Sequence, residues 1–123
     1  MTIKETIENF DEIKPNTVPY RLKYKWVNDA EDMLYKELIK PREGAAESGY
    51  VRRADRNEET ALCFTAPHDE IYYRYLSMKT ALYHADVNGY NRENALYTAE
   101  YSALRRHYDS EHKPLKKTAF FNA

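Results

Sequence analysis

Apolar residues recur with the period of an α-helix in four segments of the chain. In the first segment one helical face is formed by Ile3, Ile7 and Phe10. Thr2 and Glu5 have the spacing of a capping box, in which each side chain bonds a free backbone amide of the first turn. The pattern predicts a helix that ends near Ile13, because Lys14 precedes a proline and is disfavoured in helical geometry.

The second periodic segment predicts a core helix that ends at Lys40, before a proline. Its apolar stripe consists of Leu22, Trp26, Ala30, Met33, Leu34 and Leu38. Thr17 is the predicted N-cap, since Pro19 is tolerated in the first turn, where an amide has no partner. We expect Trp26 to be buried, so that Trp26→Ala costs about 3 to 5 kcal/mol. An exposed Trp26 that stacks on a ligand is the less favoured interpretation.

Residues 41–60 lack apolar periodicity and contain two of the three glycines, which predicts a mobile loop. Arginines 52, 53 and 56 are candidate contacts to DNA or to the loop itself. Acidic residues lie among them, so a solvated charged loop is favoured over a phosphate-binding patch for Arg52, Arg53 and Arg56. The apolar run 61–64 suits either a short strand or hairpin near 50–65 or an extended packing segment.

The third and fourth helices are predicted over about 69–87 and 92–110, separated by a tight turn with Asn91 as N-cap. The fourth helix carries two ridges. The first contains small residues with one leucine beside them: Ala95, Leu96, Ala99 and Ala103. The second contains Tyr97, Tyr101, Leu104 and Tyr108. One stripe suffices for a core, so the other predicts a second contact surface.

Tyrosines combine a large contact area with a hydroxyl that tolerates a wet edge, which suits them to protein interfaces. We therefore take four of them as candidate subunit-interface residues: Tyr73, Tyr97, Tyr101 and Tyr108. The alternative interpretation is that these tyrosines only cover the edge of the protein's own core. The sequence leaves both interpretations open.

The last segment, 113–123, has no helical period but contains two adjacent phenylalanines. Its candidate docking residues are Lys113, Leu115, Lys116, Lys117, Phe120 and Phe121. Exposed phenylalanines favour association, so we expect this segment to dock on a partner. The predicted fold is thus mostly α, with one helical domain of about four helices over 1–112 and an extended C-terminal tail over 113–123.

Composition narrows the class of protein. A chain of 123 residues with 42% hydrophobic and 32% charged residues is expected to form one globular domain with a modest core. A net charge of -1 gives no general attraction to nucleic acid, and no apolar run is long enough to span a membrane. The acidic N-terminal segment is unlike a signal peptide, and the lone Cys63 fits a reducing compartment, which together predict a cytosolic protein.

Catalytic and metal-binding patterns are not found in the sequence. The four histidines show no i, i+4 pair that would place two imidazoles over one metal ion. There is also no glycine-rich phosphate loop, nucleophile elbow or cysteine cluster. We therefore expect a protein that is not an enzyme and that needs neither a metal nor another cofactor.

Four segments taken in order resemble the small head-to-tail connector, or head completion adaptor, proteins of tailed phages and prophages. The segments are EIKPNTV at 12–18, YKWVNDAEDMLYKEL at 24–38, APHDEIYYRYL at 66–76 and YHADVNGYNRENALYTAEYSALRRHYDSEHKP at 83–114. The resemblance covers most of the chain, and 41–60 matches least. The segment VPYRLKYK at 18–25 departs from the pattern, because many such proteins begin this helix with more acidic residues.

The resemblance implies a structural virion protein that forms a homo-oligomeric ring below the portal and joins it to the neck or tail. Its implied partners are the portal protein, neighbouring copies and a downstream neck or tail-completion protein, with transient non-specific contact with passing DNA and no membrane contact. It implies assembly in the host bacterial cytoplasm and a final location in the virion neck. The alternative hypothesis is a small helical module that binds nucleic acid through arginines and stacked tyrosines.

Overall fold

The computed structural model describes residues 1–111 of the chain, and these residues are mostly helical. The helices are α1 (Ile3–Ile13), α2 (Tyr20–Leu34), α3 (Glu70–Tyr83) and α4 (Val87–Glu111), with shorter helical turns η1 (Tyr35–Ile39), η2 (Ala45–Glu47) and η3 (Arg53–Asp55). The described residues contain no strand, and near 50–65 only a single bridge joins Ala61 to Thr2. The predicted small helical bundle is confirmed, with an extended segment in place of a strand or hairpin.

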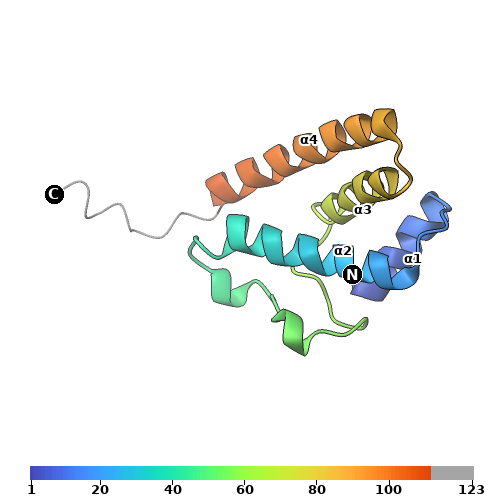
Figure 1. Cartoon of the computed structure of the whole chain (residues 1–123). Helices are drawn as coiled ribbons and strands as arrows, with labels where there is room; N and C mark the ends of the chain where they lie inside the picture. Colours follow the sequence, from blue (N-terminus) through green and yellow to red (C-terminus); the bar gives the residue numbers. More distant parts are fainter. Residues whose placement is uncertain (112–123) are drawn as a thin grey trace.

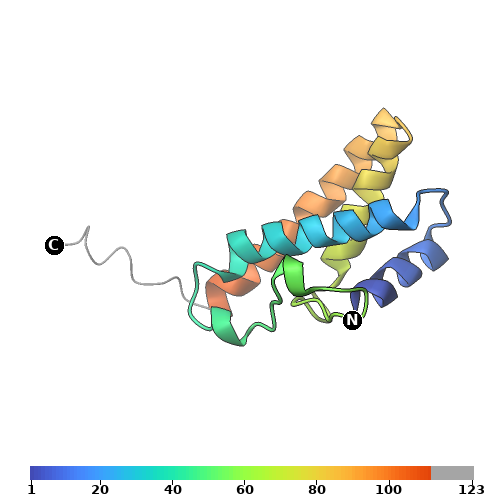
Figure 2. The same ribbon diagram turned by 60° about the horizontal axis from the view of Figure 1, so that its bottom comes forward.

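The four helices form two parts that pack across each other. Helices α3 and α4 lie side by side as a hairpin in Figures 1 and 2, while α2 crosses the hairpin and α1 packs near the N-terminal half of α2. In Figure 2 the joined end of the hairpin extends beyond α2. The core between these parts is built by side chains from all four helices and from the segment before α3: Ile7, Phe10, Leu34, Phe64, Tyr72, Leu76 and Leu104.

Helix α1 forms as its sequence pattern predicts. The Thr2 hydroxyl accepts from the Glu5 backbone N–H at 3.1 Å, and the Glu5 carboxylate accepts from the Thr2 N–H at 2.9 Å. This capping box satisfies two amides that the first turn leaves without helical partners. The predicted apolar face, including Phe10, is buried.

Helix α2 starts later than predicted, and its buried face includes Ala30 and Leu34 of the predicted stripe, while Leu22, Trp26 and Met33 are only partly buried. Pro19, with an extended ψ of 141°, precedes the first helical residue, and no side chain caps this end, so the Thr17 N-cap is wrong. The buried face runs through Val27, Ala30 and Leu34, and it includes the carboxylate of Glu31. Trp26 is half-buried, with its ring centroid 6.3 Å from that of Tyr83. We therefore expect Trp26→Ala to lower the free energy of unfolding by less than the about 3 to 5 kcal/mol expected for a fully buried tryptophan.

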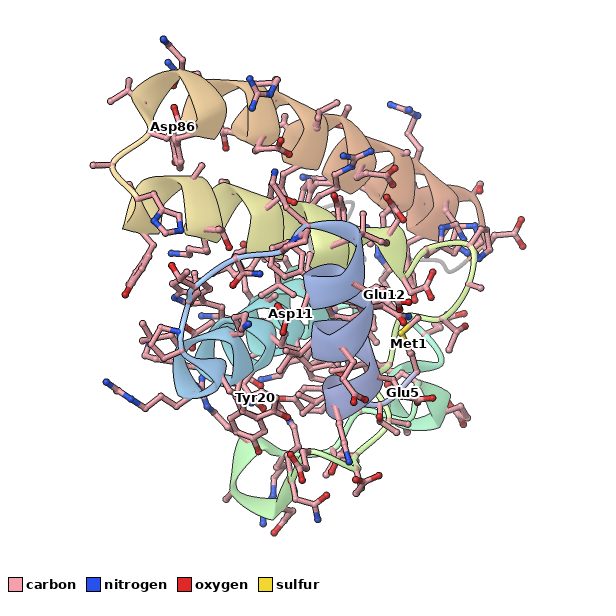
Figure 3. The ribbon with its side chains drawn as sticks, turned by 90° about the vertical axis from the view of Figure 1, so that its right-hand side faces the viewer. Met1, Glu5, Asp11, Glu12, Tyr20 and Asp86 are labelled. Atoms are coloured by element: carbon pink, nitrogen blue, oxygen red, sulfur yellow. The ribbon has the colours of Figure 1, made fainter. Side chains whose placement is uncertain are left out.

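The connection between α3 and α4 lies earlier in the chain than predicted. Ala85 adopts the left-handed conformation with φ 55°, and the Asp86 N–H donates to the Ala81 carbonyl at 2.9 Å, which closes the end of α3 as a Schellman motif. The Asp86 carboxylate then accepts from the Gly89 N–H at 2.9 Å and caps α4 (Figure 3). The predicted turn at 88–91 and the Asn91 cap are wrong, because α4 already includes these residues.

We predict that Ala85→Gly stabilises the protein. The left-handed conformation costs a residue with a Cβ about 1 kcal/mol or more, and glycine adopts it without this cost. The free energy of unfolding should therefore rise by about 0.5 to 1 kcal/mol in a urea titration. Ala95→Gly is the matched control: it lies on the exposed face of α4 and should lower stability by a similar amount. A loss of stability in Ala85→Gly would contradict the assigned turn.

Candidate protein-binding surfaces

The tyrosine ridge of α4 faces the protein's own core. The Tyr108 ring meets Phe64 at a centroid distance of 5.9 Å, and the Tyr97 ring meets Tyr75 at 5.7 Å. On α3, Tyr73 contacts Phe10 at 5.6 Å. The ridge that lies on the outside is the other one, with Ala95, Leu96, Ala99 and Ala103 exposed. The tyrosines therefore cover the edge of the core and the alanines face outward, while the role of these tyrosines in a subunit interface stays a prediction.

Two of these tyrosines also line a groove between α2 and α4. The groove has a volume of about 280 Å³, and its walls include Met33 and Glu37 from the α2–η1 segment and Tyr97 and Tyr101 from α4. The Tyr101 hydroxyl donates to a Glu37 carboxylate oxygen at 2.8 Å. The Tyr97 hydroxyl is buried and has no hydrogen-bond partner within residues 1–111. Burial raises the pKa of Tyr97, so this hydroxyl stays protonated at neutral pH.

These two hydroxyls give a matched pair of predictions. Tyr97→Phe removes a buried hydroxyl without a partner, so it should leave the free energy of unfolding unchanged or raise it by up to about 1 kcal/mol. Tyr101→Phe removes a hydrogen bond to a carboxylate and should lower stability by about 0.5 to 1 kcal/mol. Equilibrium denaturation of both variants tests the assignment. A larger loss in Tyr97→Phe than in Tyr101→Phe would show that the Tyr97 hydroxyl has a partner.

The joined end of the hairpin exposes large apolar side chains. Val87 is 69% exposed and Leu82 is 55% exposed, and with Tyr90 they line a small apolar hollow of about 90 Å³ beside Ala85. Tyr83, next in the chain, is 48% exposed. We call Leu82, Tyr83, Val87 and Tyr90 the hairpin patch. Exposed apolar side chains that gather in this way are typical of protein-interaction sites.

Leu82 and Tyr83 share one apolar helical face with the buried Tyr72 and Leu76. The sequence signal that sets Leu82 and Tyr83 apart from core residues is the width of the apolar face, which covers about half of the circumference of the helix. One packing partner cannot bury a face of this width. The structure shows which part of this apolar face is buried. Leu76 and Tyr72 are buried in the first turns of α3, while its last turn extends past α2 and leaves Leu82 exposed.

The three candidate arginines have different environments, and Arg52 is the most exposed of them. The Arg52 side chain is 80% exposed and contacts Asp55 at 3.3 Å. The Arg53 guanidinium bonds Asp29 at 2.8 Å and Asp32 at 3.3 Å. Arg56 is buried, so the expectation that it lies on a solvated loop is corrected, and its contacts are to the loop itself and to α2.

Arg56 fastens the long loop to α2. Its Nη1 donates to Asn28 Oδ1 at 2.8 Å, its Nε donates to the Val51 carbonyl at 2.7 Å, and its Nη2 pairs with Asp32. Tyr50 from the same loop donates to Asp32 at 2.8 Å. Partial burial raises the pKa of Asp32, but the hydrogen bonds from Arg56 and Tyr50 outweigh it and hold the pKa below its usual value. Residues 41–60 are thus tied to the body at several points.

A second buried polar cluster surrounds Glu31. Its carboxylate accepts from the Tyr72 hydroxyl at 2.5 Å, from the Cys63 backbone N–H at 2.9 Å and from Cys63 Sγ at 3.2 Å. Burial and the nearby Glu31 charge raise the pKa of Cys63, which keeps the thiol protonated. The cluster therefore joins α2, α3 and the segment before α3 structurally, and its thiol is not activated as a nucleophile.

The fold brings together two histidines that the sequence keeps apart. The His68 and His107 rings lie with centroids 4.3 Å apart, one before α3 and the other near the end of α4. Over residues 1–111 no group of three histidine, cysteine, aspartate or glutamate side chains is arranged to hold a metal ion. None of the helices in this part of the chain has the length and apolarity needed to cross a bilayer.

The predicted docking tail falls outside the described residues. This applies to Lys113, Leu115, Lys116, Lys117, Phe120 and Phe121. A scan against protein-family models and searches of curated proteins and of solved structures found no match to the chain.

Proposed function

We propose that this chain is a structural assembly protein, and specifically a head-to-tail connector of a tailed phage or prophage. The observation that carries the proposal is the hairpin patch, which places exposed leucine, valine and tyrosine side chains at the projecting end of α3 and α4. Such a patch suits contact with another protein rather than with a polar small molecule. The order of sequence segments that resembles connector proteins supports the more specific class.

The proposal assigns a partner to each part of the surface. The hairpin patch contacts a neighbouring copy in a homo-oligomeric ring, and the groove lined by Tyr97 and Tyr101 receives a side chain of that copy. The tail from Lys113 onwards contacts the portal protein. The exposed Arg52 is the loop arginine placed to meet passing DNA. The assembled ring lies in the virion neck, where it also meets the next neck or tail-completion protein.

The rival hypothesis, a module that binds nucleic acid, predicts a different dependence on salt. Two of the loop arginines that it would use, Arg53 and Arg56, are already paired with carboxylates on α2. The purified chain should therefore bind DNA weakly, while it should bind portal-bearing capsids in a sedimentation assay. Tight DNA binding that falls steeply between low and moderate salt, without capsid binding, would favour the rival.

A further inference from the structure

A pocket of about 410 Å³ lies where the end of α4 meets the start of the long loop. Ile39 and Tyr108 give it an apolar lining, and Glu43 and Glu47 line it with carboxylates. Gly44, in the left-handed conformation with φ 84°, turns the loop around this space. Its size falls within the range of protein ligand sites, about 300 to 1,000 Å³.

The pocket wall is fixed in place by a buried arginine. Arg42 Nε donates to the Leu38 carbonyl at 2.7 Å, and its Nη2 lies 2.8 Å from the Asp109 carboxylate. Asp109 therefore balances the charge of Arg42. Neither Glu43 nor Glu47 forms an ion pair within residues 1–111, so the pocket presents two unbalanced negative charges.

Residues 112–123 complement this pocket in charge and in apolar side chains, and they are close enough along the chain to reach it. Residues 112–123 contain three lysines and no acidic residue, with Leu115 and two phenylalanines between and after the lysines. Tyr108 in the pocket wall lies less than one helical turn before Glu111, where α4 ends. Leu115 follows Glu111 by four residues, a span of at most about 13 to 14 Å of extended chain.

We propose that the isolated protein binds its own tail in this pocket. Leu115 occupies the apolar lining formed by Ile39 and Tyr108, and Lys116 and Lys117 lie beside Glu43 and Glu47. The inference goes beyond the proposed function, because it concerns the free chain and needs no portal or second copy. Its consequence is a competition: any partner that binds the tail must first displace it from the pocket.

The test uses the full chain with a nitroxide attached at Thr118→Cys, in a Cys63→Ser background so that only one thiol is labelled. The nitroxide should broaden the NMR amide signals of Gly44 and Ser48 selectively. Glu43→Lys combined with Glu47→Lys should restore these signals, since both residues are exposed and the change reverses the pocket charge. Glu8→Lys with Glu12→Lys, an equal charge change on the exposed side of α1, is the control and should leave the broadening intact.

Three outcomes would overturn the inference. The first is that the Gly44 and Ser48 signals are no broader than those of the α1 amides. The second is that both charge variants restore the signals equally, which would indicate a general attraction to a negative protein. The third is broadening in a mixture of nitroxide-labelled chain and separate isotope-labelled chain, which would place the tail in a second copy. Capsid binding is absent from this assay, so its result is independent of the proposed function.

Discussion

Arg56→Ala is expected to lower the free energy of unfolding by about 3 kcal/mol, a large fraction of the stability of a domain of this size. The Arg56 side chain is only 1% exposed, and it holds together Asn28, Asp32 and the Val51 carbonyl. Removing it leaves buried acceptors without a donor and a partly buried carboxylate without its cation. The long loop should detach from α2, which hydrogen exchange of the amides at 50–57 would report.

Arg52→Ala is the matched control for this prediction. Arg52 lies in the same loop and also pairs with an aspartate, but its side chain is 80% exposed. Exposed ion pairs contribute little, so the change in stability should stay within about 0.5 kcal/mol. Equal losses in the two variants, measured by urea denaturation, would contradict the structural role assigned to Arg56.

Leu82→Asp combined with Val87→Asp is expected to abolish assembly while the isolated chain remains folded. Both side chains are more than half exposed, so the free energy of unfolding should change by no more than about 1 kcal/mol. In an interface each new carboxylate loses its water without gaining a partner. Self-association or capsid attachment should therefore weaken at least about a hundredfold, measured by analytical ultracentrifugation and capsid sedimentation.

Ile13→Asp tests whether this effect is specific to the hairpin patch. Ile13 is 67% exposed and lies at the end of α1, where it lines a hollow with Glu70 and Tyr73 near the start of α3, at the opposite end of that helix from Leu82. Its substitution changes exposed apolar area and charge in the same way and should leave assembly intact. If Ile13→Asp also abolishes assembly, or if the double variant assembles normally, the hairpin patch is not the interface.

The helices were predictable from the sequence because their signals are local. The apolar period of 3–10 and the capping box of Thr2 and Glu5 involve residues within three turns of one another, and α1 formed as predicted. The turn before α4 was missed for a related reason. The asparagine and glycine at 88–89 look like a turn, whereas the true turn uses Ala85, a residue that carries no turn signal.

The candidate binding surfaces depend on contacts between segments that lie far apart in the sequence, and hydrophobic periodicity does not predict such contacts. Arg56 appeared to belong to a solvated loop because its partner Asp32 lies 24 residues away on another element. The sequence shows both ridges of α4, but the ridge expected to face outward was the tyrosine ridge, and the structure places the alanine ridge there. The long tyrosine side chains of α4 reach Tyr75 and Phe64, so the large side chains of this helix face the core and its alanines face outward.

The abundance of tyrosine follows from the same geometry. The hairpin crosses α2 at an angle, so the space between α4 and the rest of the protein needs long, flat side chains (Figure 2). Tyr101 shows the advantage of a hydroxyl at this edge, since it reaches Glu37 while its ring lies beside Tyr97 at 6.3 Å. The tyrosines of the α4 ridge thus pack the protein first, while Tyr97 and Tyr101 also line the groove and Tyr83 and Tyr90 belong to the hairpin patch.

The most direct test of the connector proposal is to delete the coding sequence from a phage or prophage that carries it and to examine the induced lysate by electron microscopy. The proposal predicts DNA-containing heads without tails beside free tails, and it predicts that the purified protein restores joined particles while the Leu82→Asp, Val87→Asp variant does not. A lysate with complete, infectious particles at the normal yield would contradict the proposal.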